Sequence, residues 1–209
     1  MRTKQFCIAV FLFFMVSRSV YSQPIPVELT FGNKYLSFDL SLSKKFSENS
    51  RFGFFHMNTV QIDYKDKIGN SFILQDLLTY EAIKNLKVVG GIFYGMPGFN
   101  PTAGFQYNFV SKTTMFLFAP RVNITDTPSY DFMTILQQKI PLTDKIELFV
   151  KLKMLNVFDA NVHIKSYQWF RLGLDTNGTQ FGLAANFDEN GSNPNVQANL
   201  GFFIRKEIF

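Results

Sequence analysis

The sequence alternates apolar and polar residues with a period of two in many separate stretches. Residues 36–43 place Leu and Phe at even positions and Ser or Asp at odd positions, and residues 103–109 and 180–187 repeat the pattern with Phe, Ala, Tyr and Leu. Successive side chains of a β-strand point to opposite faces, so each stretch predicts a strand with one apolar face. This periodicity restricts the chain to an all-β fold.

Weaker alternation continues in residues 115–124, 146–154 and 162–174. Two further segments alternate poorly: His56 and Asn58 break the even apolar row of residues 51–64, and Asp76 breaks that of residues 71–81. Clusters of Gly, Pro, Asn, Asp and Ser separate the strands and predict turns. Eleven strands follow from this pattern. A short alternating stretch, Val27 to Phe31, adds a twelfth.

Such a sheet forms either a sandwich or a closed barrel. The polar faces contain mainly Ser, Gly, Gln, Asn and Thr, whereas a soluble surface normally carries abundant charge of both signs. The apolar faces carry Phe, Leu, Ile and Val on almost every strand. We therefore predict a single antiparallel transmembrane β-barrel, all-β, with twelve strands and with ten as the alternative number.

The N-terminus resembles a secretory signal peptide. A basic start precedes ten apolar residues, Cys7 to Val16, and Ser22 ends a plausible cleavage site. Ten residues in a helix span about 15 Å, half of a bilayer, so the segment is too short for a transmembrane anchor. We expect residues 1–22 to be removed and residues 23–209 to form the barrel.

Composition excludes several classes of protein. Cys7, the only cysteine, lies in the expected signal peptide, which excludes disulfides and thiolate chemistry in the mature chain. Loss of Arg2, Lys4 and Arg18 with the signal leaves 18 basic against 16 acidic residues, so nucleic acid is a poor candidate partner. No cofactor is expected.

Taken together, these features resemble a small outer-membrane β-barrel of Gram-negative bacteria over residues 23–209. The signal peptide, the repeated strands, the cysteine-free mature chain and the terminal aromatic strand ending at Phe209 carry the resemblance. It implies an outer-membrane location, contact with lipid, and recognition of the last strand by the barrel-assembly machinery. Twelve strands are similar in number to the nucleoside-channel type.

If the apolar faces meet lipid, the polar faces line a lumen. The run between residues 147 and 171 is basic with interleaved aromatic side chains, which favours anions or stacked rings. Alternatively, the cations pair with acidic side chains and stiffen a closed barrel. The candidate lumen-lining residues are Asp39, Asp63, Arg121, Glu147, Lys151, Lys153, His163, Lys165, Tyr167, Trp169 and Arg171.

We therefore predict a passive, porin-like channel for small solutes or a structural barrel. One alternative is an exported soluble β-protein, a barrel or sandwich, that binds an apolar ligand. A third, less favoured interpretation is an outer-membrane lipid hydrolase built on one of the two histidines, His56 and His163. No serine accompanies His56 locally, and Ser166 falls on the opposite strand face from His163, so no enzymatic activity is expected.

Overall fold

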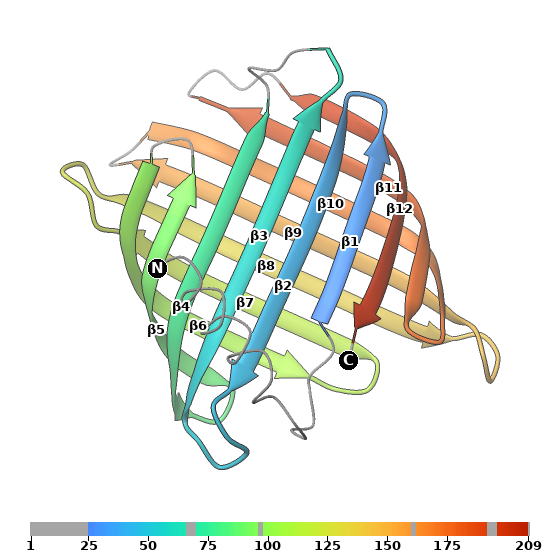
Figure 1. The fold of residues 1–209 in the computed structure, drawn as a ribbon, viewed down its shortest axis with the longest axis horizontal. Helices are drawn as coiled ribbons and strands as arrows, with labels where there is room; N and C mark the ends of the chain where they lie inside the picture. The colour runs from blue at the N-terminus through green and yellow to red at the C-terminus, as the bar shows by residue number, and fades with distance from the viewer. Residues whose placement is uncertain (1–24, 66–69, 96–97, 160–161, 192–195, 209) are drawn as a thin grey trace, which may run out of the picture.

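The computed structural model is a single closed barrel of twelve antiparallel strands, and it describes residues 25–65, 70–95, 98–159, 162–191 and 196–208. Each strand pairs with its neighbours in the sequence, and β1 pairs with β12 to close the cylinder, from Ile25 opposite Ile208 to Gly32 opposite Gly201 (Figure 1). The predicted fold and strand number are confirmed. The expected signal peptide and Phe209 lie outside the described residues.

The strands vary from eight to fifteen residues. Their bounds are β1 Ile25–Gly32, β2 Tyr35–Lys45, β3 Phe52–Asp63, β4 Ser71–Ile83, β5 Leu86–Gly95, β6 Gly98–Val110, β7 Thr114–Asn123, β8 Ser129–Pro141, β9 Glu147–Asp159, β10 Val162–Thr176, β11 Thr179–Asn190 and β12 Gln197–Ile208.

An even number of strands brings Ile25 and Ile208 to the same end of the barrel, which we call the termini end. The opposite end, which we call the loop end, holds the connections β3–β4, β7–β8 and β11–β12. No helix in the described part of the chain is long and apolar enough to cross a membrane.

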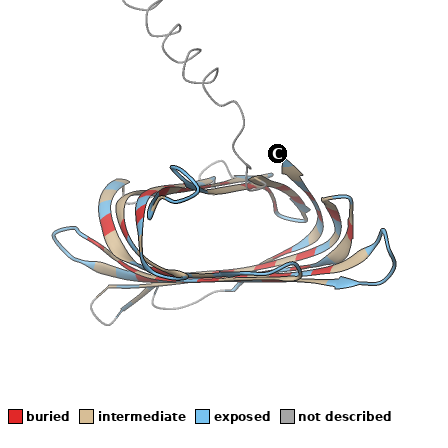
Figure 2. Ribbon diagram, turned by 90° about the horizontal axis from the view of Figure 1, so that it is seen from below, coloured by how far each residue is buried: buried red, intermediate tan, exposed pale blue. Residues whose placement is uncertain are grey.

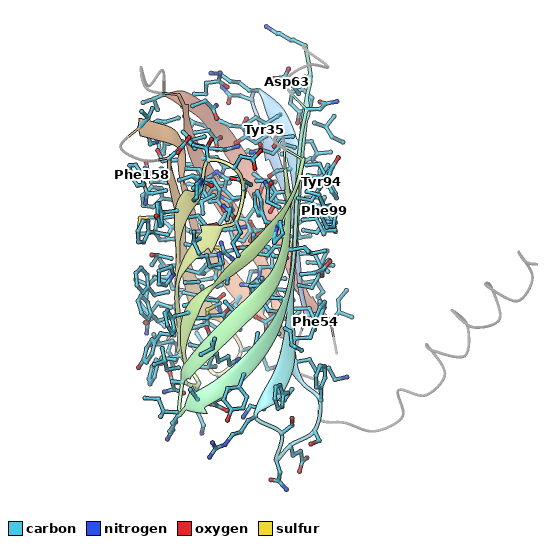
Figure 3. All side chains as sticks on the ribbon, turned by 90° about the vertical axis from the view of Figure 1, so that its left-hand side faces the viewer. Tyr35, Phe54, Asp63, Tyr94, Phe99 and Phe158 are labelled. Carbon is cyan, nitrogen blue, oxygen red and sulfur yellow. The ribbon has the colours of Figure 1, made fainter. Side chains whose placement is uncertain are left out.

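The outer face is apolar and carries two levels of aromatic rings. Near the termini end, Phe52 packs against Tyr80 with ring centroids 4.9 Å apart. Near the loop end, Tyr94 packs against Phe72 at 5.8 Å and Phe99 at 6.0 Å, and Tyr94 and Phe99 lie on the outer surface in Figure 3. Aromatic girdles around an apolar band are the pattern of a barrel wall in a bilayer. A soluble protein would not expose this band to water.

The barrel is flattened into an oval, as the end-on view in Figure 2 shows. Its interior contains an apolar cluster as well as polar side chains. The cluster is buried and draws mainly on β3, β4, β7 and β8: Phe55, Met57, Ile73, Leu77, Val89, Leu117, Ala119, Met133, Ile135, Leu155, Tyr167 and Trp169. Strands β3 and β4 are thus largely apolar on both faces, which explains their weak alternation.

Strand β10 contains an irregularity that changes which face its side chains occupy. Its register against β9 shifts between His163 and Lys165. Lys165 lies opposite Val157, which packs against the interior cluster, whereas His163 lies opposite Phe158, whose ring packs against Phe132 on the outer wall. A bulge of this kind inserts one residue and reverses the parity of what precedes it.

We predict that Gly201→Ala prevents closure of the barrel. A Cβ atom at Gly201 would lie 1.9 Å from the carbonyl oxygen of Phe31 on β1, so β1 and β12 would have to separate. We expect a loss of about 1–3 kcal/mol or more in folding free energy, seen as loss of the heat-modifiable, folded band on a gel. Gly90→Ala is the control, because its Cβ would come no closer than 3.9 Å to another atom. Equal folding of both variants would contradict the prediction.

Candidate functional site in the barrel lumen

A charged belt crosses the middle of the lumen. On β1, the carboxylate of Glu28 accepts hydrogen bonds from Lys151 Nζ on β9 and Arg171 Nε on β10, both at 2.8 Å. Glu28 is 2% exposed, and its two partners are also buried. These contacts join strands far apart around the barrel, so the oval is narrow enough here for side chains from opposite walls to meet.

A second carboxylate, Asp39 on β2, extends the belt. It accepts hydrogen bonds from Lys153 Nζ at 2.8 Å and from the hydroxyl of Thr59 at 2.6 Å. The Lys153 ammonium lies 5.0 Å from the ring centre of Trp169 and 5.8 Å from that of Tyr167, within the range of cation–π attraction. Lys153 is therefore held by a carboxylate and by two aromatic faces.

The aromatic pair on β10 links this belt to the loop end. The rings of Tyr167 and Trp169 stack with centroids 4.6 Å apart. Trp169 Nε1 donates to the carboxylate of Asp188 at 3.1 Å, and the hydroxyl of Tyr35 donates to the same carboxylate. Asn186 Nδ2 donates to the Tyr35 oxygen at 3.1 Å. The indole N–H of Trp169 and the hydroxyl of Tyr35 are thus both held by Asp188.

Arg121 on β7 forms a separate clamp on the other side of the oval. Its Nε atom donates to Asp131 on β8 at 2.6 Å, and its Nη1 atom donates to Gln75 on β4, across the lumen. All three residues are buried, at 4%, 2% and 0% exposure. The apolar cluster includes Tyr167 and Trp169 of the belt region and Ala119 and Met133 of the two strands that carry Arg121 and Asp131, so it extends from the belt to the clamp.

The termini end contains a cavity of about 610 Å³, which we call the vestibule. Its apolar lining includes Phe55, Leu117 and Ile135 of the interior cluster. Its charged lining comprises five cations and two carboxylates, a net charge of +3: Lys45, Lys87, Lys112, Lys139, Arg205, Glu81 and Glu207.

Some of these vestibule charges are paired. Lys139 contacts Asp175 at 2.7 Å and Glu207 at 3.3 Å, and Lys45 pairs with Glu81. Within the described residues, Lys87 and Lys112 have no carboxylate at ion-pair distance. The vestibule therefore presents an excess of positive charge that internal pairing does not neutralise.

The structure brings most of the candidate residues from the sequence together in the middle of the lumen. Asp63 lies instead at the loop end of β3, where it accepts a hydrogen bond from the backbone N–H of Lys65 at 2.8 Å, and Glu147 lies at the termini end of β9. Those that join the belt, the clamp or the aromatic stack are Asp39, Arg121, Lys151, Lys153, Tyr167, Trp169 and Arg171.

The lumen assignment of His163 is wrong. The register shift in β10 places its ring 5.8 Å from that of Phe158, at an angle of 65°, on the outer side near the loop end. Its Nδ1 atom lies 2.8 Å from the carbonyl oxygen of Gly191. A bulge leaves no mark in a simple alternation count, so the sequence pattern assigned His163 the parity of the strand beyond the bulge.

Apart from Asp39, sequence reasoning did not select the acidic partners of the belt, the clamp and the aromatic pair. These partners and their amide neighbour are Glu28, Asp131, Asp188 and Gln75. Glu28 and Arg205 do occupy the polar parity of their strands, which marks them as inward-facing once a barrel is assumed. Which carboxylate meets which cation depends on the folding of the sheet across the lumen, and no local pattern encodes it.

Comparison with known proteins gives a similarity of fold alone. No protein-family model matches the chain, and no curated protein matches its sequence. Among solved structures, the NanC porin aligns with a TM-score of 0.52 and 8% identity over 90% of this chain and 100% of that one. The KdgM porin aligns with a TM-score of 0.49 and 9% identity over 88% of this chain and 99% of that one. LpxR from Salmonella typhimurium aligns with a TM-score of 0.44 and 10% identity over 88% of this chain and 99% of that one.

The twelve-stranded closure, the apolar outer band and the polar belt define the class of the molecule. It is a closed, twelve-stranded antiparallel β-barrel with an apolar outer face, and its fold is similar to that of the NanC porin. Its lumen has an ion-paired middle and a cationic vestibule at one end.

We predict that Glu28→Gln destabilises the barrel by about 3–5 kcal/mol, because Lys151 and Arg171 would keep their charges in a buried site without a carboxylate. Urea titration of the folded barrel in detergent, followed by tryptophan fluorescence, measures the change. Glu48→Gln, an identical substitution at an exposed residue between β2 and β3, should leave the midpoint unchanged. Similar midpoints for the two variants would show that the belt does not stabilise the fold.

Proposed function

We propose that this protein is a porin-like channel of the outer membrane that admits small anionic solutes. The observation that carries the proposal is the vestibule, where five cations face two carboxylates. A cleft lined by one sign of charge with low-dielectric walls concentrates ions of the opposite sign. Lys87 and Lys112, which have no ion-pair partner among the described residues, are the groups on which an entering anion would be held.

The charged belt limits how such a channel conducts. A solute that crosses the middle of the barrel has to displace or slip between the contacts of Glu28 and Asp39 with their cations. The belt contains three cations, Lys151, Lys153 and Arg171, and two carboxylates, Glu28 and Asp39, so it has a net charge of +1. The belt therefore favours anions as well, with a small conductance. The fold-level similarity to the NanC porin is consistent with this role.

The proposal includes export and assembly. Residues 1–22 direct secretion, the apolar band contacts outer-membrane lipid, and the barrel-assembly machinery recognises the last strand, β12. We place the barrel in the membrane so that the termini end and its vestibule face the periplasm. The loop end, which has three connections of five to seven residues, then faces outward, where bacterial barrels usually have their longer loops.

We also propose that the protein is not an enzyme. On the outer wall, His56 pairs with Asp76, as a histidine base and its orienting carboxylate would. However, its register neighbours are Leu42 on β2 and Asp76 on β4, and its neighbours along the same face of β3 are Phe54 and Asn58. None of these supplies a hydroxyl or thiol nucleophile, which a hydrolase of this type needs.

A second candidate function, a closed structural barrel, is favoured by the belt itself. Paired and buried charges stiffen a cylinder without opening it, and an apolar cluster of buried side chains lies beside them. In this case the vestibule would bind solutes from one side only. The two candidates make opposite predictions for conduction across a planar bilayer.

We expect the purified barrel to give small, anion-selective current steps in a planar bilayer with a KCl gradient. Replacing Lys87 and Lys112 together by glutamine lowers the net charge of the vestibule lining from +3 to +1 and should shift the reversal potential toward cations. Lys84→Gln is the control, because Lys84 lies in the neighbouring β4–β5 connection but does not line the vestibule.

The absence of current steps at any salt concentration would refute the channel function and favour the structural barrel. Current steps without anion preference, or a double variant with an unchanged reversal potential, would refute the proposal that the vestibule selects anions.

A further inference from the structure

The outer wall carries a group of polar side chains on β3 and β4 that the proposed channel does not use. His56 and Asn58 on β3 and Asp76 on β4, which we call the wall cluster, interrupt the apolar band. His56 Nδ1 lies 2.7 Å from Asp76 Oδ1, and their side chains are 23% and 29% exposed. Asn58 belongs to the same outward row as His56, two residues further along the strand.

The wall cluster lies at the depth of the bilayer centre. On β4, Asp76 is four residues from Phe72 in the aromatic level near the loop end and four residues from Tyr80 in the level near the termini end. At about 3.3 Å per residue, each separation is about 13 Å along the strand. His56 lies directly opposite Asp76 in the β3–β4 register and so has the same depth.

Polar groups at this depth are costly when lipid covers them. A charged side chain on the lipid face of a barrel destabilises it, most strongly at the midplane, and more for Lys or Arg than for Asp. The bond between His56 and Asp76 satisfies one atom of each. Among the described residues, His56 Nε2 and Asp76 Oδ2 have no hydrogen-bond partner, and Asn58 Oδ1 is covered without one.

The chemistry of a pair with no net charge defines what would satisfy those atoms. Either a His56 imidazolium donates its Nδ1–H to an Asp76 carboxylate, or Nδ1 of a neutral His56 imidazole accepts a hydrogen bond from an Asp76 carboxylic acid. In both forms the proton on Nε2 remains a donor and Asp76 Oδ2 remains an acceptor. The pair thus presents one donor and one acceptor side by side to the membrane.

We propose that the wall cluster is the centre of an interface with a second copy of this chain. Two copies inserted in the same direction are related by a twofold axis along the membrane normal, which preserves depth. The His56–Asp76 pair of one copy then meets the same pair of the other, and two Nε2–H to Oδ2 hydrogen bonds can be exchanged. Another membrane protein would need a complementary donor and acceptor at this same depth.

The surroundings of the wall cluster fit such a contact. Leu42 flanks it on β2, Leu74 and Leu78 flank it on β4, and Ile92 flanks it on β5, so apolar side chains would surround the hydrogen bonds and exclude water and lipid headgroups. Gly90, opposite Leu78, carries no side chain, so the outer surface is recessed at this position of β5.

A cysteine crosslinking experiment tests the interface in native membranes. In the full chain with Cys7 replaced by serine, Leu78→Cys should give a dimer with a short bifunctional maleimide. Leu172→Cys on β10 should remain monomeric. The two leucines are matched in exposure, at 52% and 51%, and both face outward. Equal yields for the two sites, or a crosslink from Leu78→Cys to a different protein, would overturn the proposal.

A second pair of variants tests whether the wall cluster holds the dimer. Combined replacement of His56 and Asp76 by leucine should abolish the Leu78→Cys crosslink and give a monomeric mass in detergent, while the barrel keeps its heat-modifiable migration. Gln168→Leu, which removes a polar side chain from the outward row of β10, should leave the crosslink unchanged. A dimer that survives the double leucine variant, or a wild-type barrel that is monomeric in membranes, would refute the proposed role.

Discussion

Pairing of β1 with β12 is the constraint on which the other features depend. Hydrocarbon offers no hydrogen bonds, so a sheet in a bilayer must leave no edge unpaired. Here eight residue pairs, from Ile25 with Ile208 to Gly32 with Gly201, complete the cylinder. Closure separates two environments, and every strand then has to present one face to lipid and the other to the lumen.

The lumen is too narrow to leave its charges in bulk water. Flattening brings the β1–β2 wall against β9 and β10, where carboxylates and cations meet at 2.8 Å. On the other side of the oval the same narrowing is filled by apolar side chains and by the clamp of Arg121. Toward the termini end the interior widens into a cavity, and there the unpaired charge is positive.

The sequence pattern predicted the strands well where the two faces differ and poorly where they do not. Strands β2, β6 and β11 alternate cleanly because their inward faces are polar or small. Strands β3 and β4 were the weakest predictions because Phe55, Met57, Ile73 and Leu77 face inward and remove the contrast between faces. The polar residues that interrupt the alternation there, such as His56, belong to the lipid-facing row.

The site was less accessible to prediction than the fold. Strand parity places Lys151 and Arg171 on the inward face, but their partner Glu28 lies 123 residues from Lys151 and 143 from Arg171. Such pairs follow from the circumference and the flattening of the barrel. The misassigned His163 reflects another non-local effect, since the bulge in β10 is visible only in its register against β9.

The position of Glu28 also has a consequence for how the chain assembles. Glu28 is on the first strand, and its cationic partners are on the ninth and tenth, so the belt forms only after most of the barrel exists. If β1 slipped by one residue against β12, Glu28 would turn toward lipid and leave two buried cations without a carboxylate. The ion pairs of the lumen therefore favour the closed barrel in which β1 and β12 pair in the observed register over one in which they are shifted by one residue.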